Sequence, residues 1–395
     1  MLVYLLLCLV LVAQFDTCPI NERSKRQITN MYAKWPGGNI PYSYLANTAK
    51  SNIDDVEAAI KYISENTCIK FERHDECKMN CLQITDANGC HGEIGFARYV
   101  ASKYSYNGAT CEGVNSAIHE FMHTLGVYHE HQRSDRDGFI TVDNTKIPTG
   151  PGMVPQYSQQ WRTDNWSPFE YGSIMMYSVE KSFNSIKPLD AKWTETLGNR
   201  RTPTFYDIAR LNTAYYCDDG PCKLVKIDCK NGGYKHPTAC EKCICPRGFG
   251  GKLCDLQPDS TVTLKATTSF QLETVPYSRG FSPYSYIWIN APTNKYIEVR
   301  VKEIKMSEPI DDTCSKGSIE VKYMDDPRIT NPIQCAVKKI TTLKSVRNPL
   351  IIELYQRNNA GVSSVTIEYR HSPDSFKTNL TTNGYDDFKY QSSGN

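Results

Sequence analysis

The chain has 395 residues, of which 40% are hydrophobic, and its formal net charge at pH 7 is +2. This length allows two or three folded units. Because acidic and basic residues nearly balance, the composition argues against nucleic acid as a partner.

The first thirteen residues (1–13) are almost entirely apolar and predict a secretion signal peptide. They are too few to span a bilayer, and no later segment contains eighteen uninterrupted apolar residues. The sequence therefore predicts a secreted, extracellular protein that has no membrane anchor.

Cysteine usage agrees with that location, because 16 cysteines are hard to explain in a reducing compartment. Cys8 lies in the signal peptide and Cys18 follows shortly after it, which leaves an even number for pairing. The basic run from Arg23 to Arg26 precedes Gln27 and resembles a processing site. Residues 14–26 are therefore predicted to form a short pro-segment, with a solvated charge cluster as the alternative.

The longest amphipathic pattern within residues 27–217 starts at Ser51, a residue type that caps helices. Ile53, Val56, Ile60 and Ile63 then recur at helical spacing. This pattern predicts a core helix that carries no chemistry of its own.

Three histidines between positions 119 and 129 have the spacing of a zinc site. His119 and His123 are four residues apart and share one helix face. Gly126 is suited to a turn that ends the helix and brings His129 to the same ion. Three imidazoles would hold one Zn²⁺ per chain and leave a fourth position for water, as catalytic zinc sites do. A lone histidine on an apolar helix would be a satisfied core residue, but here five positions coincide.

Glu120 directly follows the first of these histidines and would lie beside the water, not on the metal. Its carboxylate could accept a proton as water attacks a carbonyl and later pass the proton to the leaving amine. The implied reaction is peptide-bond hydrolysis without a covalent intermediate.

Two further units are predicted after the histidine segment. Residues 218–255 contain six cysteines, and a unit this small must be held by disulfides, although spacing alone leaves fifteen connectivities open. Residues 258–371 carry short alternating apolar runs that predict an antiparallel β-sandwich. The polar tail 372–395 is predicted to be disordered.

Further motifs give the chain a family resemblance. Metzincins require a methionine turn after the zinc motif, and Ser173 to Tyr177 supplies one. The run Glu130 to Asp137 and the opening Trp35 to Tyr42 resemble the astacins, over residues 27–217. With its appended units the chain most resembles nematode astacins. The resemblance implies an α+β metzincin catalytic domain with two lobes around a zinc cleft.

The astacin resemblance also implies roles for single residues. His119, His123 and His129 would be the ligands, and Glu120 the general acid/base. Met175 would pack beneath the metal. Tyr177 would be a fifth ligand that swings away to stabilise the oxyanion, with an ordinary buried tyrosine as the alternative. The other histidines are expected to be structural or ordinary polar residues: His74, His91, His131, His236 and His371.

Glu130 resembles a buried family residue that reaches the new amino terminus after activation. A buried carboxylate without a partner is costly, which gives activation by cleavage a physical reason. The usual latency motif, Phe-x-Gly-Asp, is missing from residues 14–26, where Asp16 and Cys18 are candidates to block the metal.

The appended units have resemblances of their own. Residues 218–255 resemble an EGF-like module, and residues 258–371 resemble a CUB domain that lacks one of the two usual cysteine pairs. The resemblances imply these disulfides, with Cys77–Cys81 as the local bridge that remains: Cys68–Cys217, Cys77–Cys81, Cys90–Cys111, Cys222–Cys240, Cys229–Cys243, Cys245–Cys254 and Cys314–Cys335.

The sequence thus predicts a secreted zinc metalloendopeptidase that acts on protein or peptide substrates. The alternative is a catalytically idle extracellular binding protein that acts through its EGF-like and CUB-like modules, the latter a candidate site for a protein partner. Arg200, Arg201 and Lys187 are candidates for a basic substrate pocket, although surface solvation explains each of them too. Asn165 and Asn379 open glycosylation sequons.

Overall fold

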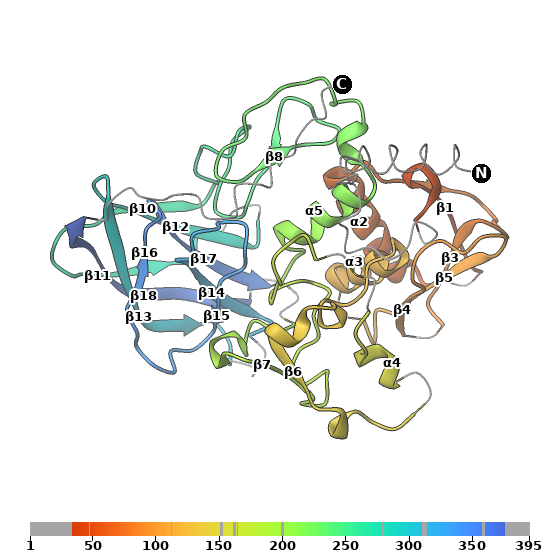
Figure 1. Cartoon of the computed structure of the whole chain (residues 1–395), viewed down its shortest axis with the longest axis horizontal. Coiled ribbons are helices and arrows are strands. Elements are labelled where there is room, and N and C mark those ends of the chain that lie inside the picture. The colour runs from red at the N-terminus through yellow and green to blue at the C-terminus, as the bar shows by residue number, and fades with distance from the viewer. Residues whose placement is uncertain are drawn as a thin grey trace, which may run out of the picture.

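The computed structural model describes residues 34–375, apart from positions 47, 88, 112, 151–152, 161–162, 164, 199–200, 279, 281, 310–313 and 358–359. A helix-containing N-terminal part, a loop-rich middle segment and a β-rich C-terminal part lie side by side (Figure 1). No helix within the described residues is both long enough and apolar enough to cross a bilayer.

The N-terminal part is built on a five-stranded sheet with an antiparallel edge. Four of its strands are parallel, and the last one runs in the opposite direction. In spatial order the strands are β2 (Lys70–Arg73), β1 (Asn39–Tyr44), β3 (Cys81–Thr85), β5 (Ala101–Tyr106) and β4 (Cys90–Gly92).

Helix α2 (Lys50–Asn66) packs its apolar face into the first core, where Val56, Ile60 and Ile63 are buried at the predicted spacing. The predicted cap was wrong, because the helix begins one residue before Ser51 and its N-cap residue is Ala49. The Ala49 N–H donates instead to the carboxylate of Asp86 at 2.7 Å. A distant acidic side chain therefore binds the backbone where the helix begins, and the N-cap residue itself makes no side-chain cap.

Helix α3 (Gly113–Thr124) is buried on all sides from Ser116 to Thr124. It ends in a Schellman motif, in which the Val127 N–H donates to Met122 O at 2.9 Å and the Gly126 N–H to His123 O at 2.7 Å. Gly126 has a φ of 93°, which a side chain would disfavour. The predicted turn at Gly126 is confirmed.

A second core is formed mainly by residues that follow the histidine segment in the chain, and it includes Ile140, Tyr157, Ile186 and Trp193. The two cores form two lobes, and the methionine turn lies between them, since Met175 packs in the first core and Met176 in the second. The elements that follow α3 are β6 (Ile140–Val142), α4 (Met153–Tyr157), β7 (Ile186–Pro188) and α5 (Phe205–Ala214). Short 3-10 turns complete this part: η3 (Pro36–Gly38), η4 (Glu130–Gln132), η5 (Arg136–Gly138), η6 (Asn144–Lys146), η7 (Ala191–Trp193) and η8 (Cys217–Asp219).

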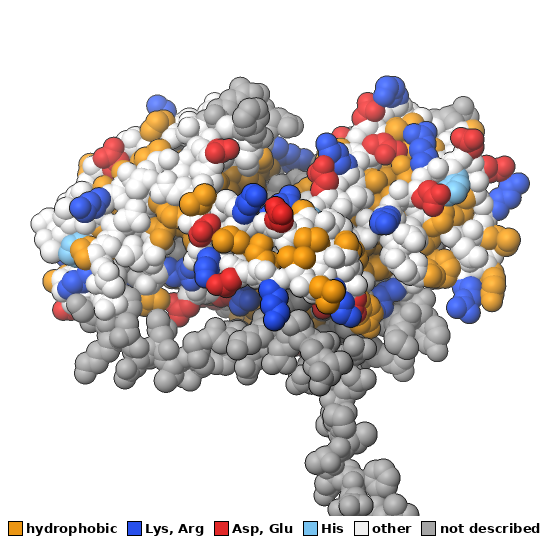
Figure 2. All heavy atoms as spheres, turned by 90° about the horizontal axis from the view of Figure 1, so that it is seen from above, with side chains coloured by type: hydrophobic (Ala, Val, Ile, Leu, Met, Phe, Trp, Pro, Cys, Tyr) orange, Lys and Arg blue, Asp and Glu red, His pale blue; other side chains and the backbone are white. Residues whose placement is uncertain are grey.

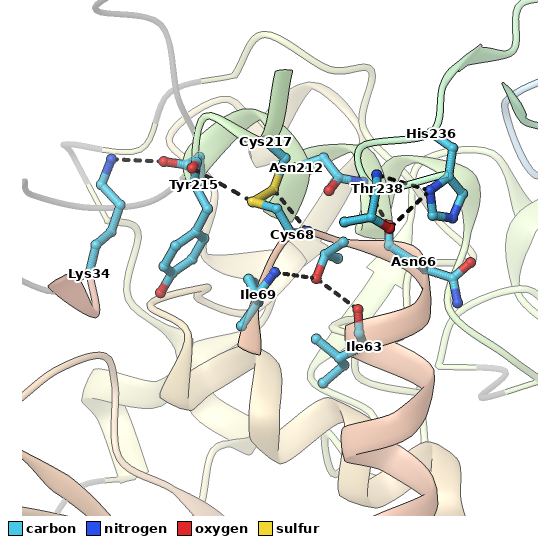
Figure 3. Close-up of a disulfide and its surroundings, with 12 residues drawn as sticks. Lys34, Ile63, Asn66, Cys68, Ile69, Asn212, Tyr215, Cys217, His236 and Thr238 are labelled. Carbon is cyan, nitrogen blue, oxygen red and sulfur yellow. Dashed lines mark hydrogen bonds between the residues drawn. A yellow bond between two sulfur atoms is a disulfide. The ribbon is translucent and has the colours of Figure 1, made fainter. Parts of the chain in front are cut away.

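The structure joins seven cysteine pairs among the residues that it describes, and they are the pairs that the resemblances imply. Cys68–Cys217 connects the end of α2 to the end of the N-terminal part, across 149 positions of sequence (Figure 3). Three further disulfides lie in the middle segment, whose only described strands are β8 (Tyr234–Lys235) and β9 (Cys243–Ile244).

The C-terminal part is a β-sandwich around a core that includes Ile287, Val299, Ile352 and Ile367. Its strands are mostly antiparallel, as predicted, but β10 and β12 pair in parallel. The last strand reaches Ser375, so the predicted start of the tail at 372 was too early. The strands are β10 (Thr261–Lys265), β11 (Gln271–Pro276), β12 (Tyr284–Asn290), β13 (Lys295–Met306), β14 (Gly317–Lys322), β15 (Ile333–Gln334), β16 (Leu343–Ser345), β17 (Leu350–Arg357) and β18 (Ala360–Ser375).

Candidate metal centre

The three histidines of the zinc motif meet at one point between the two lobes. The Nε2 atom of His129 lies 3.2 Å from Nε2 of His119 and 3.0 Å from Nε2 of His123. The exposed fractions of His129, His119 and His123 are 9%, 2% and 6%, respectively. Helix α3 supplies two of the rings, and the Gly126 turn returns the chain so that the third approaches from another direction.

Two of these rings have their orientation fixed by backbone carbonyls. His119 Nδ1 donates to Ile174 O at 2.6 Å, and His123 Nδ1 donates to Val127 O at 2.8 Å. Because a carbonyl only accepts hydrogen bonds, the proton of each neutral ring is on Nδ1. The Nε2 lone pairs are thus left to face one another, as outer hydrogen bonds arrange them at metal sites.

This donor set fits a zinc-type ion. The ligand atoms all lie within 4.8 Å of one another, and three neutral imidazoles suit borderline metals such as zinc. Lone pairs only 3.0–3.2 Å apart repel one another unless a cation lies between them. The geometry therefore agrees with the predicted ligand set.

Glu120 lies next to the first histidine on α3, with 6% of its surface exposed. Strand β4 crosses the helix closely at this residue, since a Cβ atom on Gly92 would lie 2.2 Å from Glu120 O. A glycine at position 92 allows the sheet edge to approach the helix that carries the acid.

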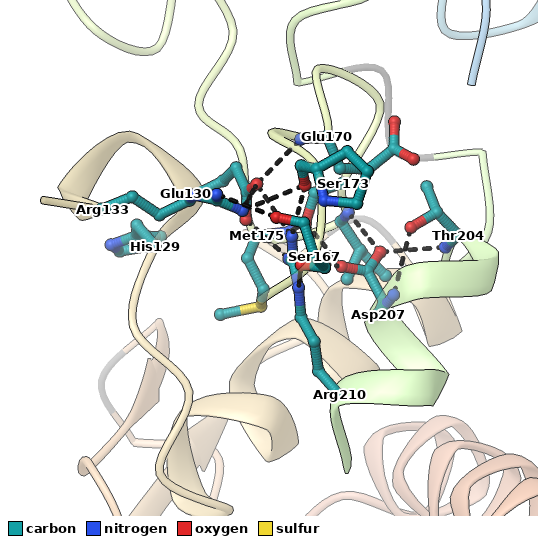
Figure 4. Close-up of polar contacts among 12 residues, drawn as sticks. His129, Glu130, Arg133, Ser167, Glu170, Ser173, Met175, Thr204, Asp207 and Arg210 are labelled. Atoms are coloured by element: carbon teal, nitrogen blue, oxygen red, sulfur yellow. Dashed lines mark hydrogen bonds and ion pairs between the residues drawn. The ribbon is translucent and has the colours of Figure 1, made fainter. Parts of the chain in front are cut away.

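The methionine turn is held by contacts that the sequence analysis did not identify. The Asp207 carboxylate of α5 accepts hydrogen bonds from Ser173 Oγ at 2.6 Å and from the Ile174 N–H at 2.9 Å (Figure 4). Ile174 O is the acceptor that orients His119. A capping pattern, Thr204 with Asp207, marks the start of α5 in the sequence, but it does not reveal that Asp207 reaches the turn.

Tyr177 lies beside the histidines, with its ring centroid 4.4 Å from that of His129. Its hydroxyl donates to Gln156 Oε1 at 3.4 Å. Met175 is fully buried, and its carbonyl accepts the Glu130 N–H at 2.9 Å. The structure thus brings both residues to the histidine cluster.

Glu130 is fully buried, and its carboxylate has several partners within the catalytic domain. It accepts hydrogen bonds from Arg210 at 2.6 and 2.9 Å, from Arg133 at 3.2 Å, and from the Glu170 N–H at 2.8 Å (Figure 4). Burial alone would raise the pKa of Glu130, but the two guanidinium groups hold that pKa below its usual value. Its contact with Gln27 stays a prediction, because Gln27 is outside the described residues.

The other histidines stay apart from the cluster or serve structural roles. His131 stacks on His129, donates to Gln156 O, and burial lowers its pKa to about 3. His236 Nε2 donates to Glu65 O, and its Nδ1 accepts the Thr238 N–H (Figure 3). The remaining three lie elsewhere: His74 near Glu72, His91 on β4 and His371 on β18.

The three residues that were candidates for a basic substrate pocket have different surroundings in the structure. Arg201 is 2% exposed and pairs with Glu320 and Glu353 of the β-sandwich, so its proposed role as a surface substrate contact was wrong. Lys187 is exposed on β7, and Arg200 is outside the described residues. On the face shown in Figure 2, basic side chains alternate with acidic ones and form no extended area of one sign.

The structure describes one of the two predicted glycosylation sequons, and the other lies outside the described residues. The Asn165 side chain donates to Ser134 Oγ at 2.8 Å, and Ser167 of the same sequon is 2% exposed. Asn379 lies outside the described residues, as do Asp16 and Cys18. Glycosylation and the blocking roles stay predictions.

The site combines a helix that carries two histidines, a third histidine after the turn that ends the helix, and a methionine turn between the two lobes. This combination defines a metal-dependent peptidase of the metzincin class. The model of the peptidase family described as Astacin matches residues 27–216. The chain is 35% identical over 386 residues to the zinc metalloproteinase nas-17 of Caenorhabditis elegans, covering 93% of this chain and 86% of that protein. The zinc metalloproteinase nas-24 of the same organism is 35% identical over 376 residues, or 89% of this chain and 90% of that protein.

Among solved structures, high choriolytic enzyme 1, a hatching enzyme zinc-protease from Oryzias latipes, is 24% identical with a TM-score of 0.43. That likeness covers 49% of this chain and 98% of the other. Because these two relatives are 35% identical to the chain over most of their length, the chain belongs to the astacin family of peptidases.

Proposed function

We propose that this astacin is a secreted zinc endopeptidase of extracellular proteins, with His119, His123 and His129 as ligands of one Zn²⁺. The observation that carries the proposal is the convergence of the three Nε2 atoms, each within 4.8 Å of the others. Relatives that carry the name zinc metalloproteinase support the choice of metal. Bound zinc would lower the pKa of a water molecule and polarise the carbonyl of the scissile bond.

The residues of the chain would do the proton chemistry. Glu120 would hold the attacking water through its carboxylate, take its proton and pass it to the leaving amine nitrogen. The phenol of Tyr177, which packs on His129, would donate a hydrogen bond to the oxyanion that forms at the carbonyl. The buried Met175 would support the site by packing alone.

The remaining parts of the proposal concern location and domains. Seven disulfides suit an oxidising, extracellular space. We assign residues 1–13 to a signal peptide, 14–26 to a pro-segment, and 27–217 to the peptidase domain. Residues 218–255 would be an EGF-like module, and 258–371 a CUB-like domain, extended to 375 by β18, that can hold a protein partner.

The test compares the processed protein with its Glu120→Ala variant on gelatin and on a generic peptide. We expect cleavage by the first protein, loss of cleavage with 1,10-phenanthroline, and a decrease of at least about a hundredfold in the variant. If both proteins give equal signals, the assignment of Glu120 is wrong. If neither cleaves any substrate, the alternative of an idle binding protein gains support.

A further inference from the structure

The C-terminal β-sandwich contacts the catalytic domain at the segment that leads into the methionine turn. Thr330, between β14 and β15, donates its backbone N–H to Glu170 Oε2 at 3.2 Å. The other oxygen of this carboxylate accepts the Gly172 N–H at 3.1 Å. Glu170 is fully buried and Thr330 is 2% exposed, so both hydrogen bonds are shielded from water. One carboxylate therefore connects the two domains at this point.

The contact at Gly172 leaves no room for a side chain. A Cβ atom on Gly172 would lie 2.7–2.9 Å from three side-chain atoms of Thr330, and these are its nearest neighbours. The glycine thus permits a close approach by a residue of the other domain.

The same segment continues into the backbone that orients a histidine. Ser173 and Ile174 follow Gly172 directly, and Asp207 anchors both of them. Ile174 O then accepts the hydrogen bond from His119 Nδ1 at 2.6 Å. A displacement at Gly172 would therefore reach His119 through two residues of backbone.

The sandwich is held firmly enough to support this segment. Arg201 of the catalytic domain donates to Glu320 at 2.6 Å and to Glu353 at 2.9 Å, and all three side chains are at most 2% exposed. Nearby, Tyr206 donates to Asp326 at 2.9 Å. Buried charges that are paired and hydrogen-bonded are costly to separate, so the junction has a defined geometry.

We propose that the C-terminal β-sandwich holds the methionine turn where it orients His119, and that Thr330 is a positioning residue of the metal centre. This inference rests on the proposed function, because it takes His119 as a zinc ligand. It gives the sandwich a role inside the enzyme, in addition to any partner that it binds.

The test is a size-complementation pair in the full-length, processed protein. The Gly172→Ala variant should push against Thr330 and displace the turn, and Thr330→Gly should remove the atoms that it meets. We measure the rate at which zinc is released to a chromogenic chelator, well below the unfolding temperature. Release should be about tenfold faster in Gly172→Ala, as for other changes behind metal ligands. In the double variant it should return close to the rate of Thr330→Gly alone.

Two further variants separate positioning from general destabilisation. Asp207→Asn removes a direct anchor of the turn and should release zinc at least as fast as Gly172→Ala. Tyr206→Phe removes an interdomain hydrogen bond that does not involve the turn, so it should lower the unfolding temperature without changing zinc release. If Gly172→Ala does not fold, Glu170→Met takes its place, because it keeps a side chain of similar volume and removes both acceptors of the two N–H donors.

Each outcome decides one question. Unchanged zinc release in Gly172→Ala, or no rescue by Thr330→Gly, overturns the inference while the proposed function stands. Zinc release that follows the unfolding temperature across all variants, Tyr206→Phe included, also overturns it. A wild-type protein that holds no stoichiometric zinc and cleaves no peptide overturns the proposed function itself.

Discussion

Two clusters of buried arginine–carboxylate pairs hold different parts of this molecule together. Inside the catalytic domain Arg210 pairs with Glu130 at 2.6 Å, and between the domains Arg201 pairs with Glu320 at the same distance. In both pairs the side chains are at most 2% exposed. The chemistry and burial are nearly the same, but the first cluster supports the backbone of the metal centre and the second joins two folding units.

The difference shows that burial of an ion pair says little about its role until its neighbours are known. The Glu130 N–H also donates to Met175 O, so the first cluster is continuous with the methionine turn. Around the second cluster, Lys322 and Arg247 give the carboxylates further cationic neighbours. We therefore expect the same substitution to have different effects in the two places.

The largest effect is expected for Arg210→Met. Among the described residues it leaves the buried Glu130 with Arg133 as a cationic partner, and breaking a buried pair on one side costs about 3–5 kcal/mol. The free energy of unfolding, measured with urea by intrinsic fluorescence, should fall by that amount in one transition. A loss below about 1 kcal/mol would show that the other partners of Glu130 satisfy it without Arg210.

The next effect is a pH dependence of the free energy of unfolding that comes from Glu170, which lies between the two clusters. Burial, and then the nearby negative charge of Asp207, raise the pKa of Glu170 to about 8. The folded protein therefore keeps a proton that the unfolded chain loses above its ordinary pKa of 4.5. Stability from this group is fully present below about pH 4.5 and is lost as the pH rises toward 8.

The Glu170→Gln variant tests that prediction, because its amide does not titrate. Urea unfolding at a series of pH values from about 4.5 to about 8.5 should give a flatter curve for the variant than for the wild type. Parallel curves would mean that Glu170 keeps an ordinary pKa in the folded protein.

The smallest effect is expected for Arg201→Met, about 2 kcal/mol, because Lys322 and Arg247 remain beside the two carboxylates. The loss should concern the junction between the domains. Calorimetry should therefore show the sandwich and the catalytic domain unfolding in separate steps, whereas Arg210→Met retains a single step. Two steps in both variants, or in neither, would remove the distinction between the clusters.

Features set by neighbours in sequence could be predicted. The spacing of His119, His123 and Gly126 follows from helix geometry, and the structure has the helix, its Schellman end and the converging rings. The apolar period of α2 is also a local property, and Val56 and Ile60 are buried as expected.

Features that depend on distant residues could not be predicted. Arg210, which pairs with Glu130, is 80 positions away on α5, and the carboxylate that binds the backbone at the start of α2 is Asp86. Arg201 looks like a surface cation in the sequence, because nothing near it indicates that the sandwich will cover it. Spacing in the sequence carries no information about such pairs, whose members come together only in the folded chain.

The Cys68–Cys217 disulfide has a consequence for the integrity of the enzyme. It encloses the three histidines, Met175 and Tyr177 within one covalent loop. A single cut at an exposed position such as Val154, which is 58% exposed, would divide the polypeptide without separating its halves. The nicked enzyme would run as one band on a gel until the disulfide is reduced, and its two fragments would still assemble one active site.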